Sequence, residues 1–196
     1  MNLANKLSLF RIILAPLFFV AYILSTQFID NAILSVALIW SIFFVSEITD
    51  MFDGMAARRL KQTTDFGKLI DPFADTLMQI TCFLCFVIDG IIPAVLFLVI
   101  LYREFGILFI RNLMLKKGIA MGARTSGKVK TVTYIVAAST VLLYIGLYRL
   151  GIFVFLQPAL KITAIVIFYL SVLFSVISFL DYVFVYRTAG KSETEK

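Results

Sequence analysis

The chain has 196 residues, of which 61% are hydrophobic, with a formal net charge of +6 and a mean hydropathy of +0.99. Soluble globular domains are only about half apolar, so this composition excludes an ordinary soluble domain and indicates one integral membrane domain. The sequence contains no histidine. Imidazole is therefore excluded as a metal ligand or general base, and carboxylates must do any acid–base chemistry at neutral pH.

Six apolar segments are each long enough to cross a bilayer, which takes about 20 helical residues. They are Leu9–Thr26, Asn31–Thr49, Leu69–Ile88, Ile91–Leu113, Val129–Leu150 and Leu160–Tyr186. This pattern predicts an all-α bundle of six transmembrane helices, preceded by a short N-terminal interfacial segment. Pro72 is expected in the first turn of the third helix, with Asp71 as its cap. The membrane domain is expected to cover residues 1–190, followed by a polar tail at 191–196.

The basic residues are distributed unequally between the two sides of this bundle. Only Arg149 and Lys161 fall on one side, whereas most of the 18 Lys and Arg residues flank the opposite ends of the segments. The positive-inside rule then predicts that both termini and residues 50–75 face the cytoplasm, in a multi-pass protein of the inner (cytoplasmic) cell membrane. The basic loops lack the aromatic interleaving of a nucleic-acid binder and suit anionic membrane lipids instead.

Four aspartates are concentrated around the connection between the second and third segments. Asp50 and Asp53 are three residues apart, and Asp71 and Asp75 are four apart, so each pair shares one face of a helix. At bilayer depth an ionised acid costs about 2.5–3.5 kcal/mol on insertion scales, so four acids imply a strong compensating charge. Carboxylate oxygens suit Mg²⁺, Mn²⁺ or Ca²⁺, and four carboxylates can hold two ions around a phosphoryl group.

The residues between these acids favour a site for a phosphorylated ligand. Gly54 and Gly67 allow close approach of a ligand, and Arg58 offers a planar fork for a phosphate. The alternative is that the acids are interfacial and pair with neighbouring cations, namely Arg58, Arg59, Lys61 and Lys68. Asp75 argues for the metal site, because it lies a full turn inside an apolar segment with no basic residue near it in sequence.

The pattern Asp50-x2-Asp53-Gly54-x2-Ala57-Arg58-x8-Gly67-x3-Asp71-x3-Asp75 resembles the signature of the CDP-alcohol phosphatidyltransferase family at all eight fixed positions. In that family a cytidine-diphosphate lipid and an alcohol react to give a phosphodiester and CMP. The resemblance implies that Asp50, Asp53 and Asp71 bind two divalent ions, Mg²⁺ or Mn²⁺. Asp75 would reach one of them and act as base on the acceptor hydroxyl. The residues implied to line the nucleotide and diphosphate pocket are Gly54, Ala57, Arg58, Thr64 and Gly67.

Three further stretches resemble the phosphatidylglycerophosphate synthase branch of the family. They are residues 1–11, Arg103-Glu104-x6-Arg111, and residues 127–131 with the sequence Gly-Lys-Val-Lys-Thr. That branch uses CDP-diacylglycerol and sn-glycerol 3-phosphate, and the resemblance also implies a homodimer. An anionic acceptor needs cations beside the site, and Arg111, Lys128 and then Arg103 are the candidates for binding its phosphate.

Several alternatives stay open at this point. Lys128 and Lys130 are also explained by positive-inside anchoring, Arg103 by pairing with an acid such as Glu104, and Arg11 by binding lipid headgroups. Two positions depart from the branch, which has proline at the position of Ala4 and lysine at that of Thr76. Inositol phosphate, serine and phosphatidylglycerol are therefore alternative acceptors. A small cation transporter, with acids lining a pathway, is an alternative of another class.

Overall fold

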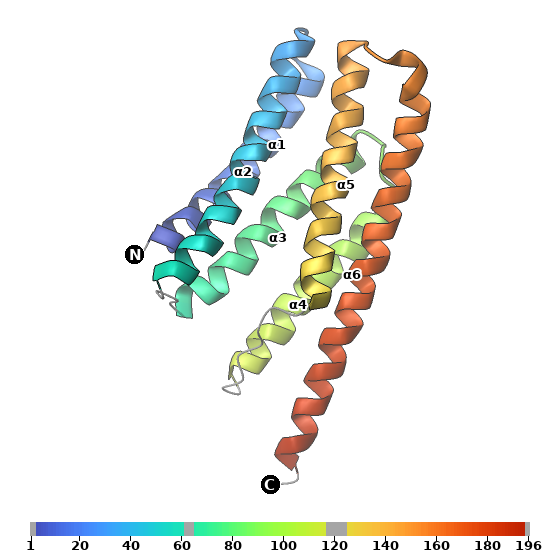
Figure 1. Ribbon diagram of the computed structural model, residues 1–196. Coiled ribbons are helices and arrows are strands. Elements are labelled where there is room, and N and C mark those ends of the chain that lie inside the picture. Colours follow the sequence, from blue (N-terminus) through green and yellow to red (C-terminus); the bar gives the residue numbers. More distant parts are fainter. Residues whose placement is uncertain (1–2, 61–64, 117–124, 195–196) are drawn as a thin grey trace.

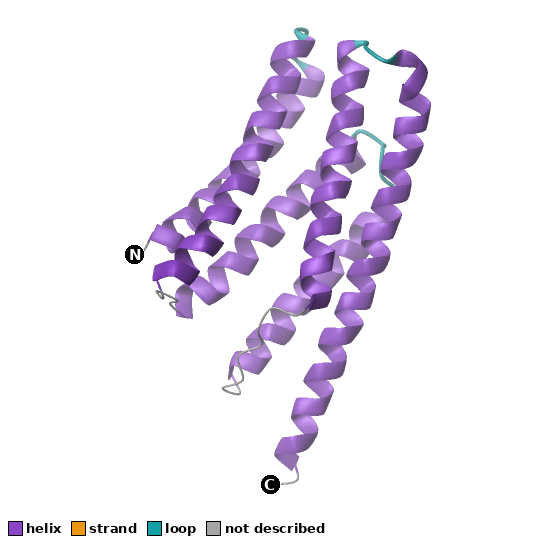
Figure 2. Ribbon diagram, in the orientation of Figure 1, coloured by secondary structure: helices purple, strands orange, loops and turns teal. Residues whose placement is uncertain are grey.

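The computed structural model describes residues 3–60, 65–116 and 125–194; the side chains of residues 3–4, 53–60, 65–66, 68–69, 125 and 189–194 are not described. Every described element is a helix (Figure 2). The elements are α1 (Leu3–Gln27), α2 (Ala32–Leu60), α3 (Asp65–Ile88), α4 (Ala94–Lys116), α5 (Thr125–Leu150), the 3-10 turn η1 (Val154–Leu156) and α6 (Gln157–Thr194). The prediction of an all-α bundle is confirmed.

Five of the long helices are long and apolar enough to cross a membrane. These candidate spans are Asn5–Gln27, Ala32–Phe52, Ile70–Ile88, Ser126–Leu150 and Val154–Thr188. The remaining long helix, α4, differs from them in carrying Arg103, Glu104 and Arg111 within an otherwise apolar sequence. Large apolar side chains such as Ile33, Phe109 and Phe184 are exposed on the outside of the bundle, as lipid-facing residues of a multi-pass membrane protein are.

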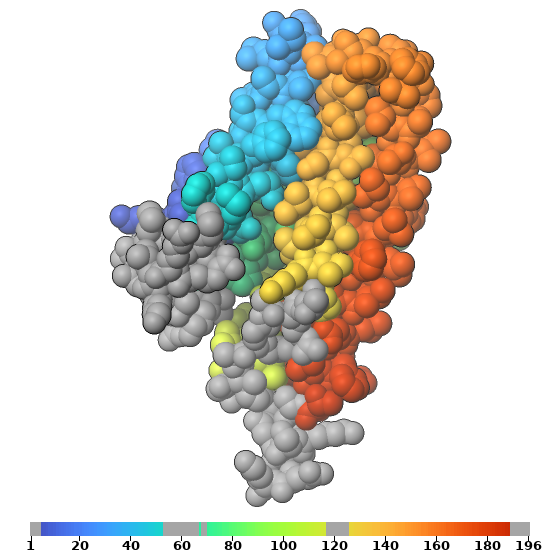
Figure 3. Space-filling view, in the orientation of Figure 1, coloured from blue at the N-terminus to red at the C-terminus, as the bar shows by residue number. Residues whose placement is uncertain are grey.

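The helices run alternately up and down, so both chain ends lie toward the same end of the bundle (Figure 1). Helix α1 packs against α2 and α3, α5 packs against α6, and α4 lies against α3 and α6. The side chains of α2 and α5 meet along one face of the molecule (Figure 3). Because α2 ends and α3 and α5 begin at the end that holds the termini, polar residues near those helix ends come together there.

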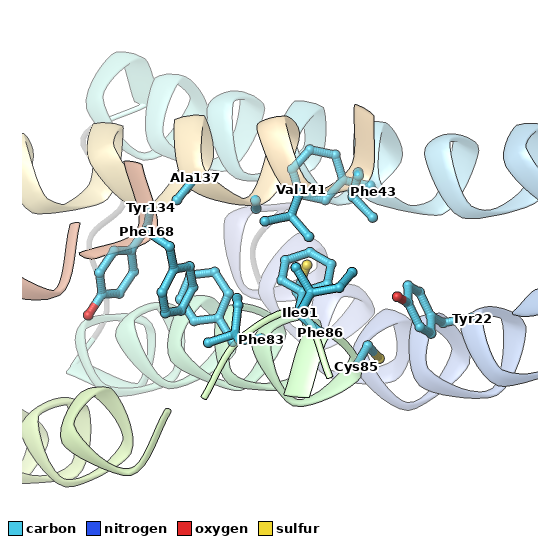
Figure 4. Packing of buried hydrophobic residues seen from close by; sticks show 14 of the residues in the cluster. Tyr22, Phe43, Phe83, Cys85, Phe86, Ile91, Tyr134, Ala137, Val141 and Phe168 are labelled. Carbon is cyan, nitrogen blue, oxygen red and sulfur yellow. The ribbon is translucent and has the colours of Figure 1, made fainter. Parts of the chain in front are cut away.

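An aromatic core holds the two halves of the bundle together. Phe83 of α3 packs edge-on against Tyr134 of α5 and Phe168 of α6, with ring centroids 5.2 and 5.0 Å apart (Figure 4). Edge-to-face pairs of this kind contribute about 0.5–1.5 kcal/mol beyond the area that they bury. Cys82 and Cys85 are free and buried in the same core, as packing residues are expected to be.

At the end away from the termini, the turn between α3 and α4 is fixed by a glycine and a hydrogen bond. Gly90 has a φ of 66°, a left-handed conformation that glycine adopts without steric cost. The hydroxyl of Tyr22 in α1 donates to Oδ2 of Asp89 at 2.6 Å. These contacts fix the far ends of α1 and α3, and so fix how the two helices approach each other at the opposite end.

Two local predictions are corrected. Helix α1 is continuous from Leu3, so the described residues include no separate interfacial segment before the first span. Helix α3 begins at Asp65 rather than near Leu69, so Pro72 lies in its interior and Asp71 is not a cap. An interior proline removes one backbone donor and crowds the carbonyl four residues earlier, but α3 continues through Pro72. As a result, Asp71 and Asp75 both project from the body of one helix.

Candidate active site

Three helices bring the predicted acids together around one arginine. Arg11 of α1 is only 2% exposed, and its Nη1 donates to Oδ1 of both Asp50 in α2 and Asp75 in α3. One turn earlier in α1, the buried Ser8 hydroxyl donates to Oδ1 of Asp71. The carboxylates of Asp50 and Asp75 therefore face each other across a single guanidinium nitrogen, although they are 25 residues apart in sequence.

The other residues of the acidic motif are only partly described. Asp53, Gly54, Ala57 and Arg58 lie within α2, but their side chains are outside the described set, and Thr64 lies outside the described residues altogether. Gly67 is buried in the first turn of α3. The sequence-based roles of these residues in binding a nucleotide and diphosphate therefore stay predictions.

The acids present fit a divalent ion by their chemistry. Asp50, Asp71 and Asp75 offer only oxygen donors, from adjoining helices, which is the ligand type that Mg²⁺ and Mn²⁺ prefer. Among the side chains that the structure describes, no three acids form a metal-binding group by themselves. Asp53, the fourth acid of the motif, is not in that set. The residues that would hold such ions are those of the four-acid motif.

Arg11 is a residue of the acid cluster whose role the sequence leaves open, with lipid headgroup binding as one alternative. The sequence predicts divalent ions as the compensating charge, with the cations of residues 58–68 as the alternative; the structure pairs Asp50 and Asp75 with Arg11. A signal was present in the sequence. Asn5, Ser8 and Arg11 are spaced by three residues in an apolar helix, so they share one face, and all three are buried.

Beside this cluster lies a cavity of about 260 Å³ between α3, α4, α5 and α6. The acids Asp71 and Asp75 line it from α3, and the three cations that the sequence suggested for an acceptor phosphate line it from α4 and α5. Its lining residues are Asp71, Pro72, Asp75, Thr76, Gln79, Arg103, Glu104, Ile107, Leu108, Arg111, Gly127, Lys128, Lys130, Thr131 and Tyr182. Thus one cavity unites residues from the acidic motif and from both basic stretches.

The three predicted phosphate ligands differ in how free their donors are. Arg111 donates through Nη2 to the Tyr182 hydroxyl at 2.8 Å, and its buried Nε has no hydrogen-bond partner within the described structure. Lys128 is exposed at the cavity and has no ion pair with a described acid. These two side chains retain donors for a ligand. Tyr182, which sequence reasoning missed, orients Arg111, with the guanidinium carbon 5.3 Å from the centre of its ring.

Arg103, by contrast, is held within the wall of the cavity. Its Nε donates to the carbonyl oxygen of Ser175 at 3.1 Å, its Nη2 to Oγ of Ser178 at 2.9 Å, and its Nη1 to Oε1 of Glu104 at 2.6 Å. Each of its three nitrogens is therefore used inside the protein. The geometry favours the structural alternative for Arg103, in which it ties α4 to α6 and supports Glu104.

Lys130 lies in the wall rather than at a lipid headgroup. It is 6% exposed, its Nζ is 2.9 Å from Oε1 of Glu104 and 3.1 Å from Oε1 of Gln79, and it lies 4.3 Å from the centre of the Tyr134 ring. Positive-inside anchoring therefore does not explain this residue. Residues two positions apart on a helix point in different directions, so Lys128 is exposed while Lys130 is buried.

The sequence profile of the family described as "CDP-alcohol phosphatidyltransferase" matches residues 1–183, most of the chain. The chain belongs to the CDP-alcohol phosphatidyltransferase family. It is therefore a transferase of phospholipid biosynthesis with membrane-embedded helices. This assignment agrees with the resemblance of the acidic motif and sets aside the cation transporter.

Curated relatives of this phosphatidyltransferase come from distant bacteria. The CDP-diacylglycerol–glycerol-3-phosphate 3-phosphatidyltransferase of Treponema pallidum (strain Nichols) is 37% identical over 155 residues, which cover 76% of this chain and 71% of the relative. The protein of the same name from Bacillus subtilis (strain 168) is 32% identical over 190 residues, 92% of this chain and 93% of the relative. A probable phosphatidylglycerophosphate synthase of Mycobacterium tuberculosis (strain H37Rv) is 34% identical over 182 residues, 93% of this chain and 80% of the relative.

Replacing Arg11 in this phosphatidyltransferase tests its role as counterion. Arg11→Met would leave Asp50 and Asp75 facing each other without a cation. Breaking a fully buried pair costs about 3–5 kcal/mol, but these two side chains remain 41% and 40% exposed, so we expect the free energy of unfolding to fall by about 1–3 kcal/mol. Denaturant unfolding in mixed micelles measures this change.

The matched control is Arg187→Met, at an exposed position on α6, where a change within about 0.5 kcal/mol is expected. Added Mn²⁺ is expected to restore more stability to Arg11→Met than to the unchanged protein, because a cation can then neutralise the two carboxylates. Equal losses in the Arg11 and Arg187 variants would contradict the assignment of Arg11.

Proposed function

We propose that this phosphatidyltransferase transfers the phosphatidyl group of CDP-diacylglycerol to sn-glycerol 3-phosphate, giving phosphatidylglycerol phosphate and CMP. The observation that carries the proposal is the division of charge across the cavity. Asp71 and Asp75 line one wall, whereas Arg111 and Lys128 retain free donors at the other. A site with an acidic wall and a basic wall suits a metal-bound diphosphate on one side and a phosphorylated alcohol on the other. The names of the relatives support the same acceptor.

The reaction needs one proton transfer and one displacement at phosphorus. We assign Asp75 as the base, because its carboxylate belongs to the acid cluster and also lines the cavity. Its carboxylate would take the proton of the acceptor hydroxyl as the oxygen forms a bond to the phosphatidyl phosphorus, while the bond from that phosphorus to the CMP oxygen breaks. Two divalent ions, held by Asp50, Asp53, Asp71 and Asp75, would supply neutralisation of the diphosphate and of the charge that develops on CMP.

Arg111 and Lys128 would bind the phosphate of the acceptor and so hold its hydroxyl near Asp75. Arg111 is presented for this by Tyr182, which accepts from Nη2 and leaves Nε for a ligand. Thr76, one of the departures from the branch, is buried and lines the cavity beside Asp75, so this wall carries a small hydroxyl side chain rather than a cation. The cations that would select an anionic acceptor are therefore on α4 and α5.

The membrane arrangement belongs to the same proposal. We infer that all six long helices cross the inner membrane and that the active site faces the cytoplasm, where both substrates and the basic helix ends would lie. Arg149, at the far end of α5, donates to the carbonyl of Ile29 between α1 and α2, so this cation on the opposite side has a structural partner within the protein. A homodimer is also proposed, and the mass of the purified protein in nanodiscs tests it.

The direct experiment measures CMP release by the purified protein from CDP-diacylglycerol, with labelled sn-glycerol 3-phosphate and Mg²⁺ or Mn²⁺. Release of CMP with formation of labelled lipid is expected. Parallel reactions with inositol phosphate, serine and phosphatidylglycerol test the alternative acceptors. Release with one of these and not with glycerol 3-phosphate would refute the proposed acceptor, while no release with any alcohol from folded protein would refute the reaction.

Arg111→Ala and Lys128→Ala are expected to raise the KM for glycerol 3-phosphate by about 10- to 100-fold, because each removes a charge-assisted hydrogen bond to a phosphate. The effect of Arg111→Ala should be the larger, since Arg111 is partly buried and Lys128 is exposed. The KM for CDP-diacylglycerol should change much less. Initial rates at varied concentrations of each substrate check this, with Lys161→Ala at the far end of the bundle as control. Equal increases in both KM values would indicate a structural role.

A further inference from the structure

Three polar side chains in the lining of the cavity contact one another: Gln79 of α3, Glu104 of α4 and Lys130 of α5. We call these three residues the cavity floor. Glu104 and Lys130 are 4% and 6% exposed, whereas Lys128 on the same helix as Lys130 is exposed. The cavity thus has a charged, accessible side at Arg111 and Lys128 and a buried polar side at the floor. Nothing in the reaction proposed above uses the floor.

The ammonium group of Lys130 is fixed from several directions. Glu104 Oε1 at 2.9 Å and Gln79 Oε1 at 3.1 Å accept hydrogen bonds from it, and the Tyr134 ring lies beneath it at 4.3 Å. Glu104 is itself held by Arg103, which is anchored on α6. A side chain held in this way presents a defined donor geometry to whatever occupies the cavity.

The hydrogen bond to Lys130 also fixes the orientation of Gln79. An ammonium only donates, so the carboxamide oxygen must face Lys130 and the amide nitrogen must point elsewhere. That nitrogen carries two donors, and the described residues provide no acceptor for it. Because Gln79 lines the cavity, these donors are available to a ligand.

Gln79 lies one helical turn beyond Asp75, so the two side chains share a face of α3, with Cβ atoms about 5–6 Å apart. We propose that Gln79, held in place by Lys130, recognises the hydroxyl group of the acceptor that does not react. The inference rests on the proposed function. Glycerol 3-phosphate carries a phosphate at one end, the reacting hydroxyl at the other and a second hydroxyl between them. With the phosphate at Arg111 and Lys128 and the reacting hydroxyl at Asp75, the middle hydroxyl faces the floor.

This arrangement makes the floor a determinant of acceptor specificity. The oxygen of the middle hydroxyl accepts a hydrogen bond from the amide nitrogen of Gln79, and Lys130 fixes the orientation of this amide by donating to its oxygen. An acceptor without this hydroxyl leaves the donors of the half-buried Gln79 amide without a partner, which is the kind of mismatch that enzymes reject. Lys130 and Glu104 are positioning residues in this scheme, since Lys130 acts on the acceptor only through Gln79, and Glu104 only through Lys130.

The test compares two acceptors, sn-glycerol 3-phosphate and 3-hydroxypropyl phosphate, which keeps the phosphate and the primary hydroxyl and lacks the secondary one. With CDP-diacylglycerol as donor, the unchanged protein is expected to favour glycerol 3-phosphate in kcat/KM by about 10- to 100-fold. Gln79→Leu should remove most of this preference by lowering kcat/KM for glycerol 3-phosphate, with less than about a threefold change for the deoxy acceptor.

Gln79→Glu is the second variant, because it keeps an oxygen for Lys130 and loses the amide donors. It should also lose the preference, which separates recognition of the hydroxyl from support of Lys130. The matched control is Gln27→Leu, at the exposed far end of α1, which should keep the preference.

Two results would overturn the inference alone: release of CMP with both acceptors at equal kcat/KM in the unchanged protein, or equal losses for both acceptors in Gln79→Leu. If the folded, unchanged protein releases no CMP with glycerol 3-phosphate, the proposed function fails and the inference fails with it. The two failures are therefore distinguished by the unchanged protein with its proposed acceptor.

Discussion

Asp75→Asn is expected to lower the rate of CMP release by about 10²–10⁴-fold, the contribution of a positioned general base. Asparagine keeps the size of the side chain and an oxygen that can accept the hydrogen bond from Arg11, but it cannot take the proton of the acceptor hydroxyl. The folded bundle should therefore persist while turnover is lost. The measurement is CMP release at saturating concentrations of both substrates, together with thermal unfolding of the same preparation.

Asp30→Asn is the matched control for this loss. Asp30 is exposed in the connection between α1 and α2, at the far end of the bundle from Asp75, so its replacement should leave the rate unchanged. The Asp75→Asn variant should still bind CDP-diacylglycerol, and titration with a labelled donor measures this binding. If Asp75→Asn kept near-normal turnover, another group would have to accept the proton and the assignment of the base would be wrong.

Glu104→Ala is expected to cost about 3–5 kcal/mol of folding free energy, because it leaves two buried cations without their shared counterion. Glu104 is almost fully buried and accepts from both Arg103 at 2.6 Å and Lys130 at 2.9 Å. Since these residues join α4, α5 and α6, the loss should weaken the packing of all three helices. Denaturant unfolding in mixed micelles, compared with the unchanged protein, measures it.

Two further variants show whether the loss of charge causes the loss of stability in Glu104→Ala. Glu104→Gln keeps the shape and one acceptor oxygen, so its loss should be clearly smaller than that of Glu104→Ala. In the double variant Glu104→Met with Lys130→Met, one cation is removed together with the acid, so the combined cost should be less than the sum of the two single changes. Additive costs would mean that Glu104 and Lys130 are not coupled, contrary to the 2.9 Å contact.

The acidic motif shows how much a linear pattern can predict. The spacing of Asp71 and Asp75 placed both acids on one helix face, and α3 has them there. The resemblance of the whole motif to a known signature indicated the family, which the profile match confirms. Spacing along one helix says nothing about which residue of another helix lies opposite. For that reason the sequence does not predict the pairing of Arg11 with Asp50 and Asp75, which are 39 and 64 residues away in the chain.

The basic residues show what the sequence alone does not predict, namely which cations are available to a ligand. Arg111, Lys128 and Lys130 all read as cations near the cytoplasmic ends of helices, and the sequence favoured the first two for the acceptor. Only packing distinguishes these cations from one another. Arg111 and Lys128 keep free donors, whereas Lys130 is buried against Glu104 and Gln79. Arg103 is likewise held, by hydrogen bonds to α6. Whether a cation is available to a ligand depends on which acceptors neighbouring helices place around it, and those acceptors lie up to 75 residues away in the chain.

By itself the sequence determined the all-helical class and the membrane character, because each depends on composition or on spacing within one helix, and the resemblance of its acidic motif to a known signature indicated the family. The tertiary structure alone decided which residues meet. It placed Arg11 between Asp50 and Asp75, opened a cavity from Asp75 to Arg111, and formed the floor from three separate helices. The physical reason is that an active site at a helix-bundle interface depends on the rotation and register of each helix against its neighbours, which are set by packing across the whole bundle.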